Sequence, residues 1–235
     1  MTSLRGILAT LVLGVAAAIV IVAVSIIPFL NPVFVGFEQD RAQAQAWTGW
    51  TTAELRTVTD AVLSDLILGP PAFDVALDGT PVLDVRERQH MADVRSVFAA
   101  FYVVAAGAAM LLAVAFVIAR GPRARSVLWG RLARSGAWIA VITVVGGVIG
   151  VLFFDQAFEL FHTIFFPAGS YNFDPGTERL VQLFPYQFWV ETTIAVGTLV
   201  VALSLLLWWF GRRRAAANAA EAATAVAAAT AVQAS

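Results

Sequence analysis

The sequence predicts a mainly α-helical membrane protein, in which a four-transmembrane-helix bundle carries a small mixed α/β extracytoplasmic cap. The composition supports this class, because 60% of the 235 residues are hydrophobic, only 13% are charged and the mean hydropathy is +0.80. Soluble domains are closer to half apolar, with about 25% charged residues. Four long apolar runs and the uneven placement of arginine complete the prediction. The net charge of −1 gives no indication of a nucleic-acid partner.

Four predicted transmembrane helices cover residues 1–30, 97–119, 137–154 and 190–210. Each is close to the roughly 20 residues that a hydrocarbon core of about 30 Å requires. The first could also be a signal peptide, because Arg5 precedes its apolar run. That run is longer than the usual core of about 7–15 residues and shows no clear cleavage site, so we favour an uncleaved span.

Arginine placement predicts the orientation of the bundle. Nine of the fifteen basic residues, all arginines, flank the spans on one side: Arg5, Arg120, Arg123, Arg125, Arg131, Arg134, Arg212, Arg213 and Arg214. By the positive-inside rule this side is cytoplasmic. We therefore expect cytoplasmic termini, a basic cytoplasmic loop at 120–136, and two cap segments outside, at 31–96 and 155–189. The Ala-rich tail, 211–235, is expected to be helical or disordered, without assigned chemistry.

The first cap segment contains signals for a helix and a hairpin. The stretch "TTAELRTVTDAVLSDLILG" has an apolar stripe at helical spacing, and Thr51 and Glu54 have the spacing of a capping box. The run Gly69-Pro70-Pro71 predicts its end. In "FDVALDGTPVLDV", alternation around Asp78-Gly79 predicts a β-hairpin.

The second cap segment contains a turn signal and a short helix. The sequence Asp174-Pro175-Gly176 predicts the turn, and Pro185 is expected to end the helix that follows it. We expect both segments to pack together as one lid.

Residue types that are absent from the chain exclude several kinds of chemistry. There is no cysteine, which excludes disulfides, a thiol nucleophile, a cysteine zinc site and the lipid-bearing cysteine of a lipoprotein. There is no lysine, which excludes Schiff-base chemistry and a phosphate-binding Walker loop. The sequence contains no GxSxG motif, so nothing indicates a serine hydrolase. A zinc site of two histidines and carboxylates stays possible, but no HExxH spacing favours it, and no cofactor is expected.

The chain has two histidines, His90 and His162, and both are candidates for catalysis. His90 precedes the second predicted span by about six residues, and His162 follows the third by about eight. If both spans continue as helices rising about 1.5 Å per residue, each ring stands roughly 10 Å above the outer edge of the hydrocarbon core. The two imidazoles could therefore face each other at the mouth of the bundle.

Acidic residues flank both histidines at helical spacing. Glu87 and Asp93 lie three residues on either side of His90, and Asp155 and Glu159 precede His162 by seven and three residues. A neighbouring carboxylate fixes the tautomer of an imidazole and raises its pKa, whereas apolar surroundings lower it. A base near neutral pH suits general base catalysis. The alternative, that these are hydrogen-bonded structural histidines, stays open.

Three segments carry a resemblance to a known family. They are "ERQHMADV" at 87–94, "FHTIFFPAGSYNFDP" at 161–175 and "RLVQLFPYQFW" at 179–189. Together with the order of spans and loops over residues 1–211, they resemble the four-span bacterial integral membrane proteins of the lipoprotein intramolecular transacylase family. Tyr171 stands where many relatives are expected to have Trp. Tyr171 and Asn172 are further candidates for orienting groups or for binding substrate.

The resemblance implies a reaction and a location. Members move the sn-2 acyl chain of a diacylglyceryl-cysteine lipoprotein onto the α-amino group of the same cysteine, which gives a lyso-form lipoprotein. The resemblance implies that no cofactor takes part. It implies membrane lipids and a diacylated lipoprotein N-terminus as partners. It also implies a site on the outer face of the bacterial cytoplasmic membrane. The two family histidines map onto His90 and His162, as the acid and base.

Two other function classes stay open. One is a non-enzymatic membrane scaffold or lipid-binding protein of the same family, in which the histidines are structural. The other is a transporter, which is less favoured because the spans carry almost no internal charge and no obvious repeat. The sequence gives no oligomeric state.

Overall fold

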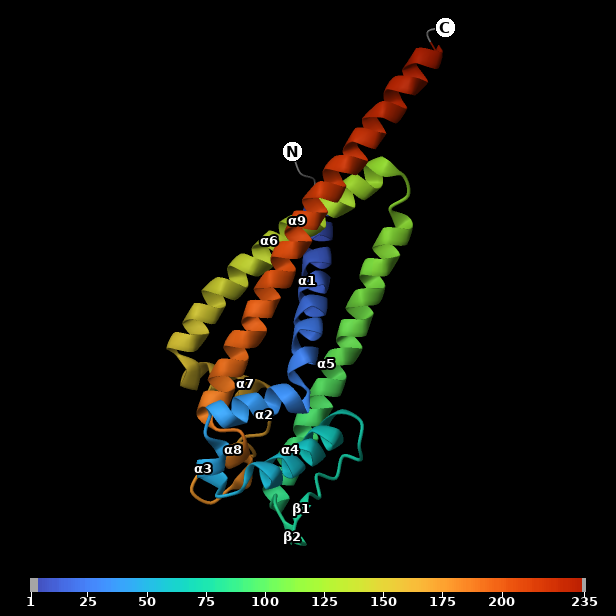
Figure 1. Cartoon of the computed structure of the whole chain (residues 1–235). Coiled ribbons are helices and arrows are strands. Elements are labelled where there is room, and N and C mark those ends of the chain that lie inside the picture. The colour runs from blue at the N-terminus through green and yellow to red at the C-terminus, as the bar shows by residue number, and fades with distance from the viewer. Residues whose placement is uncertain (1–3, 234–235) are drawn as a thin grey trace. The chain divides into compact units, whose positions relative to one another are not determined.

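The computed structural model describes residues 4–233, which are mostly helical (Figure 1). Within this part of the chain, four helices are long and apolar enough to cross a membrane: α1 (Leu4–Ile26), α5 (Val85–Ile118), α6 (Pro122–Leu152) and α9 (Tyr186–Gln233). The predicted number of membrane helices is confirmed.

The chain divides into two compact units. One comprises Met1–Val24, Val103–Val145 and Thr198–Ser235, and the other comprises Ser25–Tyr102 and Gly146–Gly197. Each of the four long helices contributes residues to both units, and the shorter elements all belong to the second.

In the first unit, small residues allow the helices to approach closely. A Cβ atom on Gly136 of α6 would lie only 2.6 Å from the carbonyl oxygen of Ser204 on α9, so this contact requires glycine. Close backbone approach of this kind is a common way for membrane helices to associate, because lipid gives little hydrophobic drive between them. A buried cluster of Leu13, Ala17, Leu128 and Leu132 joins α1 to α6 in the same unit.

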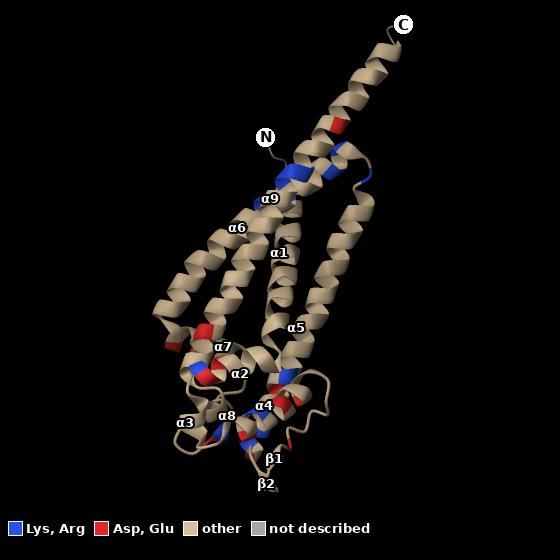
Figure 2. Cartoon of the chain, viewed as in Figure 1, with Lys and Arg blue, Asp and Glu red and all other residues tan. Residues whose placement is uncertain are grey.

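Seven of the nine basic residues of this unit lie in the first half of α6 and on α9 beyond its apolar stretch (Figure 2). On α9 each arginine of the run 212–214 stacks on the aromatic ring four residues before it, the closest being Arg213 at 4.2 Å from the Trp209 ring centroid. The helix then continues through the Ala-rich tail to Gln233. The tail was expected to be either helical or disordered, and it is helical up to Gln233.

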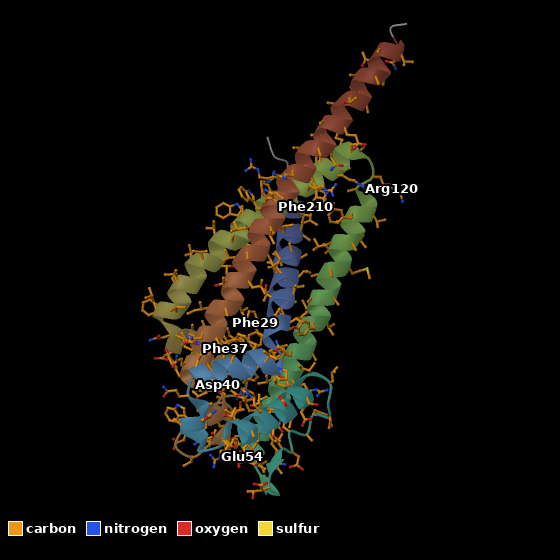
Figure 3. All side chains as sticks on the ribbon, viewed as in Figure 1. Phe29, Phe37, Asp40, Glu54, Arg120 and Phe210 are labelled. Carbon is orange, nitrogen blue, oxygen red and sulfur yellow. The ribbon has the colours of Figure 1, made fainter. Side chains whose placement is uncertain are left out.

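The second unit consists of the ends of the long helices and several short elements. These are the 3-10 turn η1 (Ile27–Phe29), α2 (Pro32–Arg41), α3 (Ala44–Thr48), α4 (Thr52–Ile67), β1 (Ala76–Leu77), β2 (Thr80–Pro81), α7 (Phe154–Phe165) and α8 (Arg179–Leu183). The labelled side chains of Phe37 and Asp40 mark α2, and Glu54 marks the first turn of α4 (Figure 3).

The predicted capping box of α4 is confirmed. The Thr51 hydroxyl accepts a hydrogen bond from the Glu54 N–H at 3.3 Å, and the Glu54 carboxylate accepts one from the Thr51 N–H at 2.7 Å. This reciprocal pair satisfies two donors that the helix start would otherwise leave free. The apolar stripe of α4 is fully buried at Leu55 and Val58, so the helix supplies one wall of the core.

The predicted hairpin is confirmed, but it is short. β1 and β2 pair antiparallel, with Ala76 opposite Pro81 and Leu77 opposite Thr80. Asp78 and Gly79 both have positive φ, 50° and 78°, as the tight hairpin turn between the strands requires. Each strand has only two residues, so the mixed α/β character predicted for the cap reduces to a helical unit with one small ribbon.

The two predicted cap segments pack together, as expected. Their shared core combines Leu55, Val58 and Phe73 of the first segment with Leu183 of the second. Buried polar contacts also join them, since the Gln39 amide donates to the Leu183 carbonyl at 3.0 Å. The turn at 174–176 is present, with the Gly176 N–H donating to Asp174 Oδ1 at 2.8 Å, and α8 ends two residues before Pro185.

Several helix boundaries differ from those expected. α5 begins at Val85, twelve residues before the predicted span, and α6 begins at Pro122, so most of the predicted loop 120–136 is helical. Proline at a first helical position followed by good helix formers favours such a start. The third difference bears on the site: the helix breaks at Phe153 (φ −124°, ψ 47°), and His162 lies on the separate helix α7 rather than on a continuation of the span.

Replacing Leu55 by alanine tests the importance of the core of the second unit. Because Leu55 is fully buried, Leu55→Ala should lower the free energy of unfolding by about 2–5 kcal/mol. Leu68→Ala is the matched control, because Leu68 is 89% exposed and the change should stay within about 0.5 kcal/mol. Unfolding of both variants in the same detergent gives the comparison, and equal effects would contradict the described core.

Candidate functional site

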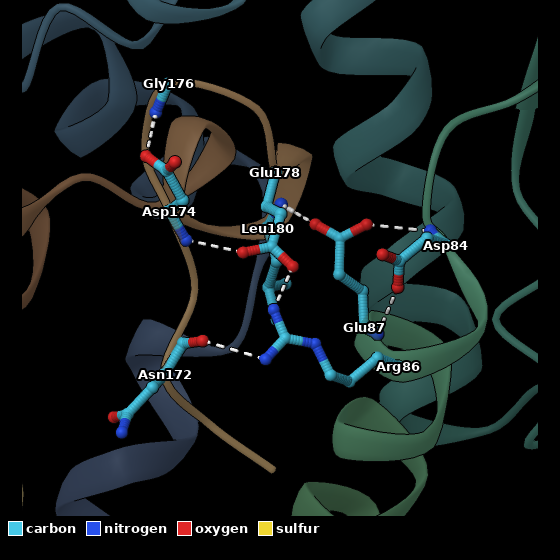
Figure 4. Close-up of polar contacts among 8 residues, drawn as sticks. All are labelled: Asp84, Arg86, Glu87, Asn172, Asp174, Gly176, Glu178 and Leu180. Atoms are coloured by element: carbon cyan, nitrogen blue, oxygen red, sulfur yellow. Dashed lines mark hydrogen bonds and ion pairs between the residues drawn. The ribbon is translucent and has the colours of Figure 1, made fainter. Parts of the chain in front are cut away.

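His90 is positioned by the first turn of α5. The Asp84 carboxylate accepts a hydrogen bond from the Glu87 N–H at 2.8 Å, and Glu87 Oε2 accepts one from the Asp84 N–H at 2.7 Å (Figure 4). This is a second capping box, with aspartate in place of serine or threonine. His90 follows Glu87 by three residues, so the cap fixes the helix turn from which the imidazole projects.

Glu87 also ties this turn to the second cap segment. Its Oε1 accepts a hydrogen bond from the backbone N–H of Leu180 at 2.6 Å. Glu87 is only 2% exposed, so this bond is buried. Beside it, Arg86 donates to the Asn172 carbonyl oxygen at 2.9 Å and pairs with Glu178 (Figure 4). The first turn of α5 therefore holds both ends of the stretch 172–180.

His162 is positioned by α7 and by its own backbone contact. Its Nδ1 lies 2.7 Å from the carbonyl oxygen of Phe158, one helical turn earlier. A carbonyl oxygen can only accept, so this contact assigns the proton to Nδ1 and leaves the lone pair on Nε2. His162 is thus prepared to act as a base through Nε2.

The two imidazoles form a stacked pair. Their ring centroids are 6.0 Å apart and their planes differ by 22°. Both side chains are buried, with 6% and 8% exposure. Aromatic rings surround the pair, the nearest to one or both imidazoles being those of Phe158, Phe161, Phe166, Tyr171 and Phe173.

Burial lowers the pKa of His162 below its ordinary value of 6.5, because the apolar surroundings disfavour the imidazolium ion. The hydrogen bond to the Phe158 carbonyl and the charge of Glu159 act in the opposite direction and only partly offset this effect. The sequence predicted both influences, and burial is the stronger. The imidazole is therefore neutral at neutral pH, as a general base must be.

The flanking acids do not contact the imidazoles in the way that their spacing suggested. Glu87 is engaged by the backbone, Asp93 accepts a hydrogen bond from the Gln89 amide at 3.1 Å, and Asp155 interacts with the Tyr186 hydroxyl. Helical spacing places these carboxylates near the imidazoles, but other donors form hydrogen bonds with their oxygens. Within residues 4–233, the Nδ1 atom of His90 is buried without a hydrogen-bond partner.

Glu159 reaches His162 through Tyr171. The Tyr171 hydroxyl donates to Glu159 Oε1 at 2.9 Å, and the tyrosine ring lies 4.9 Å from the His162 ring. This hydrogen bond to the carboxylate raises the pKa of Tyr171. Asn172 accepts a hydrogen bond from Arg86 through its backbone oxygen. Its role in orienting groups or binding substrate stays a prediction.

Sequence reasoning missed the aromatic enclosure of His90. Phe166 and Phe173 lie 4.8 Å and 5.4 Å from its ring centroid, although they are distant from it in sequence. The only available signal was the density of phenylalanine in 161–173. No group of three histidine, cysteine or acidic side chains in the described chain is placed to hold a metal ion.

The fold and the site together define a membrane-integral protein with a buried pair of histidines that is enclosed by aromatic rings. The family model "Lipoprotein intramolecular transacylase Lit" matches residues 10–189, and the chain belongs to this family. The resemblance seen in the three sequence segments is therefore confirmed. The family is one of acyltransferases that act on lipoproteins in the membrane. A search of curated proteins gives no match.

Solved structures with the same fold come from Bacillus cereus. The membrane-integral lipoprotein intramolecular transacylase Lit of that organism has a TM-score of 0.72 at 19% identity, covering 89% of this chain and 95% of the other. A variant of that protein with one histidine replaced by arginine has a TM-score of 0.75 at 17% identity, covering 92% and 95%. A variant with alanine at the same position has a TM-score of 0.68 at 18% identity, covering 89% and 93%. At these identities the likeness shows the fold.

The lowered pKa of His162 predicts a dependence of stability on pH. Between the folded pKa and the ordinary value of 6.5, the unfolded chain binds more protons than the folded one. Stability should therefore fall as the pH decreases below about 6.5. Unfolding midpoints of the wild type and of His162→Gln, measured in detergent from about pH 7.5 to about pH 5.5, should show a weaker fall in the variant. An identical slope in both proteins would contradict the buried, neutral imidazole.

Proposed function

We propose that this protein is an intramolecular O-to-N transacylase that acts on the diacylglyceryl-cysteine terminus of a lipoprotein. The acyl chain at the sn-2 ester would move to the α-amino group of the same cysteine. The observation that carries the proposal is the stacked pair of buried imidazoles, of which His162 is neutral with Nε2 unprotonated. Family membership supports the same chemistry.

In the proposed reaction, the neutral amine of the substrate attacks the ester carbonyl carbon. A carbon–nitrogen bond forms and the carbon–oxygen bond to the glyceryl group breaks. His162 Nε2 accepts the proton that the amine loses, and the glyceryl oxygen gains one as it departs. The sum is an isomerisation, so the step consumes no co-reactant and leaves no group on the protein.

His90 is assigned the complementary role. Its Nδ1 is the buried ring atom that lacks a hydrogen-bond partner in the described chain, so it is free to bind a substrate atom. A proton on that nitrogen would stabilise the oxyanion of the tetrahedral intermediate or pass to the departing glyceryl oxygen. The ring centroids are 6.0 Å apart, so both imidazoles can contact the same substrate molecule.

The absence of cysteine and lysine suits this mechanism, because no covalent intermediate with the protein is required. Both reacting groups belong to one substrate molecule, so the protein needs only to hold them in an attacking geometry. The aromatic rings around the pair exclude water, which would otherwise hydrolyse the ester. Tyr171, held by Glu159, is proposed to orient the His162 ring.

We place the site on the extracytoplasmic face of a bacterial cytoplasmic membrane, with both termini inside. The nine flanking arginines support this orientation by the positive-inside rule. A diacylated lipoprotein terminus would then be presented in the outer leaflet, with its acyl chains among membrane lipids. The proposed crossing segments are those predicted from the sequence, 1–30, 97–119, 137–154 and 190–210.

The His pair is tested by single and double substitution. If His90 and His162 act as a unit, His90→Ala and His162→Ala should each reduce acyl transfer by about 10²–10⁴-fold, and the double variant little further. Gln89→Ala and Thr163→Ala are matched controls, because they change the adjacent residue on each helix. Transfer is measured on a diacylated lipopeptide, with fragmentation in the mass spectrometer locating the acyl chain, since migration conserves mass.

The fold of each variant is checked by its unfolding midpoint in detergent. Wild-type transfer by a well-folded His162→Ala protein would mean that this histidine is structural. Additive losses in the double variant would instead mean that the two rings act separately.

The orientation is tested with reporters placed in two turns. A reporter inserted between Asp78 and Gly79 should give a signal outside the cytoplasm, and one inserted after Gly121 should give a cytoplasmic signal. Both sites are exposed turns, which are the places where insertions are tolerated best. A cytoplasmic signal from the hairpin turn would reverse the assignment and remove the site from the outer face.

A further inference from the structure

Helix α7 exposes more apolar surface than a helix in water would. Its twelve residues span about 18 Å, too short to cross a hydrocarbon core of about 30 Å. It nevertheless leaves large apolar side chains exposed, namely Phe153 at its N-cap (56%), Leu160 (60%), Phe161 (47%), Ile164 (65%) and Phe165 (48%). Contiguous exposed patches of this kind mark interaction surfaces.

At about 100° per residue, the side chains of α7 fall into three stripes. The inward stripe, which faces the rest of the second unit, is Phe154 and His162, which are buried, and Phe158, which is half-buried. Phe165 follows on the same side but is 48% exposed. An exposed apolar stripe is Phe153, Ala157, Leu160, Phe161 and Ile164. An exposed polar stripe is Asp155, Gln156, Glu159 and Thr163. One helix therefore presents a different surface to each of three environments.

We propose that α7 lies in the membrane interface, with its apolar stripe among phospholipid acyl chains and its polar stripe toward water. The apolar stripe is continuous with exposed apolar residues at the end of α6, a candidate membrane helix, where Val148, Ile149 and Leu152 are 56%, 54% and 71% exposed. In a membrane-integral chain, lipid covers that part of α6. The same acyl chains would therefore also cover the adjoining apolar stripe of α7. Amphipathic helices of this kind bury their apolar face about 5–10 Å into the boundary between headgroups and acyl chains.

This placement fixes the depth of His162, which lies at the edge of the inward stripe that is next to the polar stripe. Its imidazole then sits near the level of the glycerol ester groups of the lipids. In a consequence that rests on the proposed function, the ester of an acylated glyceryl substrate reaches the base by moving sideways within the leaflet. The substrate does not need to leave the bilayer.

The absence of cysteine allows a direct test with single-cysteine fluorescent labels. Ile164→Cys and Leu160→Cys place the label on the apolar stripe, and Thr163→Cys and Gln156→Cys are controls on the polar stripe. All four positions are exposed, so the fold should tolerate the labels. Each labelled protein is reconstituted into phosphatidylcholine–phosphatidylglycerol vesicles whose acyl chains carry bromine near either the ester end or the methyl end.

Bromine near the ester end should quench the labels at positions 160 and 164 several-fold more than those at 156 and 163. Bromine near the methyl end should quench the first two less well. Equal quenching on both stripes, or none on the apolar stripe, would overturn the proposal. Protection from bromine together with self-quenching between labelled copies would show that a second chain covers the stripe instead.

The same measurement on a His162→Ala background separates this proposal from the proposed reaction. The lipid contact of α7 does not require an active site, so the quenching pattern should be unchanged when acyl transfer is lost. A normal quenching pattern in a protein that shows no transfer at all would sink the reaction and leave the interfacial helix in place. Normal transfer with equal quenching on both stripes would do the reverse.

Discussion

The geometry of the site depends on one buried carboxylate. Glu87 accepts hydrogen bonds from the backbone of Asp84 and of Leu180, residues separated by almost a hundred positions. A carboxylate on a residue with 2% exposure is stable only if such partners satisfy it, and its removal would leave the buried Leu180 N–H unpaired at about 1–3 kcal/mol. The helix that carries His90 and the segment that carries Phe173 are thereby held in one register.

The enclosure of the histidine pair sets its protonation. Two imidazolium ions at 6.0 Å would repel each other strongly where aromatic rings exclude water. The pair can therefore hold at most one extra proton with ease, and the neutral form is favoured by burial. The two imidazoles are distinguished by their contacts. His162 has its Nδ1 committed to the Phe158 carbonyl, whereas the Nδ1 of His90 has no hydrogen-bond partner within residues 4–233.

Local signals in the sequence predicted the local structure well. The Thr51–Glu54 cap and the Asp78-Gly79 turn depend on neighbouring residues only, so their patterns were sufficient. The predicted end of the third span, residue 154, lies close to the break at Phe153. The separate helix α7 after it was not predicted, because no glycine or proline marks the break and the apolar run continues through it. The destination of Glu87 was missed because its partner is remote in sequence. The spacing of acids around the histidines identified the right region and the wrong contacts.

The uninterrupted course of α9 has a consequence for its tail. Its 48 residues extend about 72 Å, more than twice the thickness of a hydrocarbon core. Starting a helix is unfavourable, but each residue added to an existing helix costs little. The Ala-rich stretch after Arg214 grows from a helix that the apolar part has already started. On warming, this stretch should therefore lose helix gradually from its C-terminal side, rather than melt in one cooperative step.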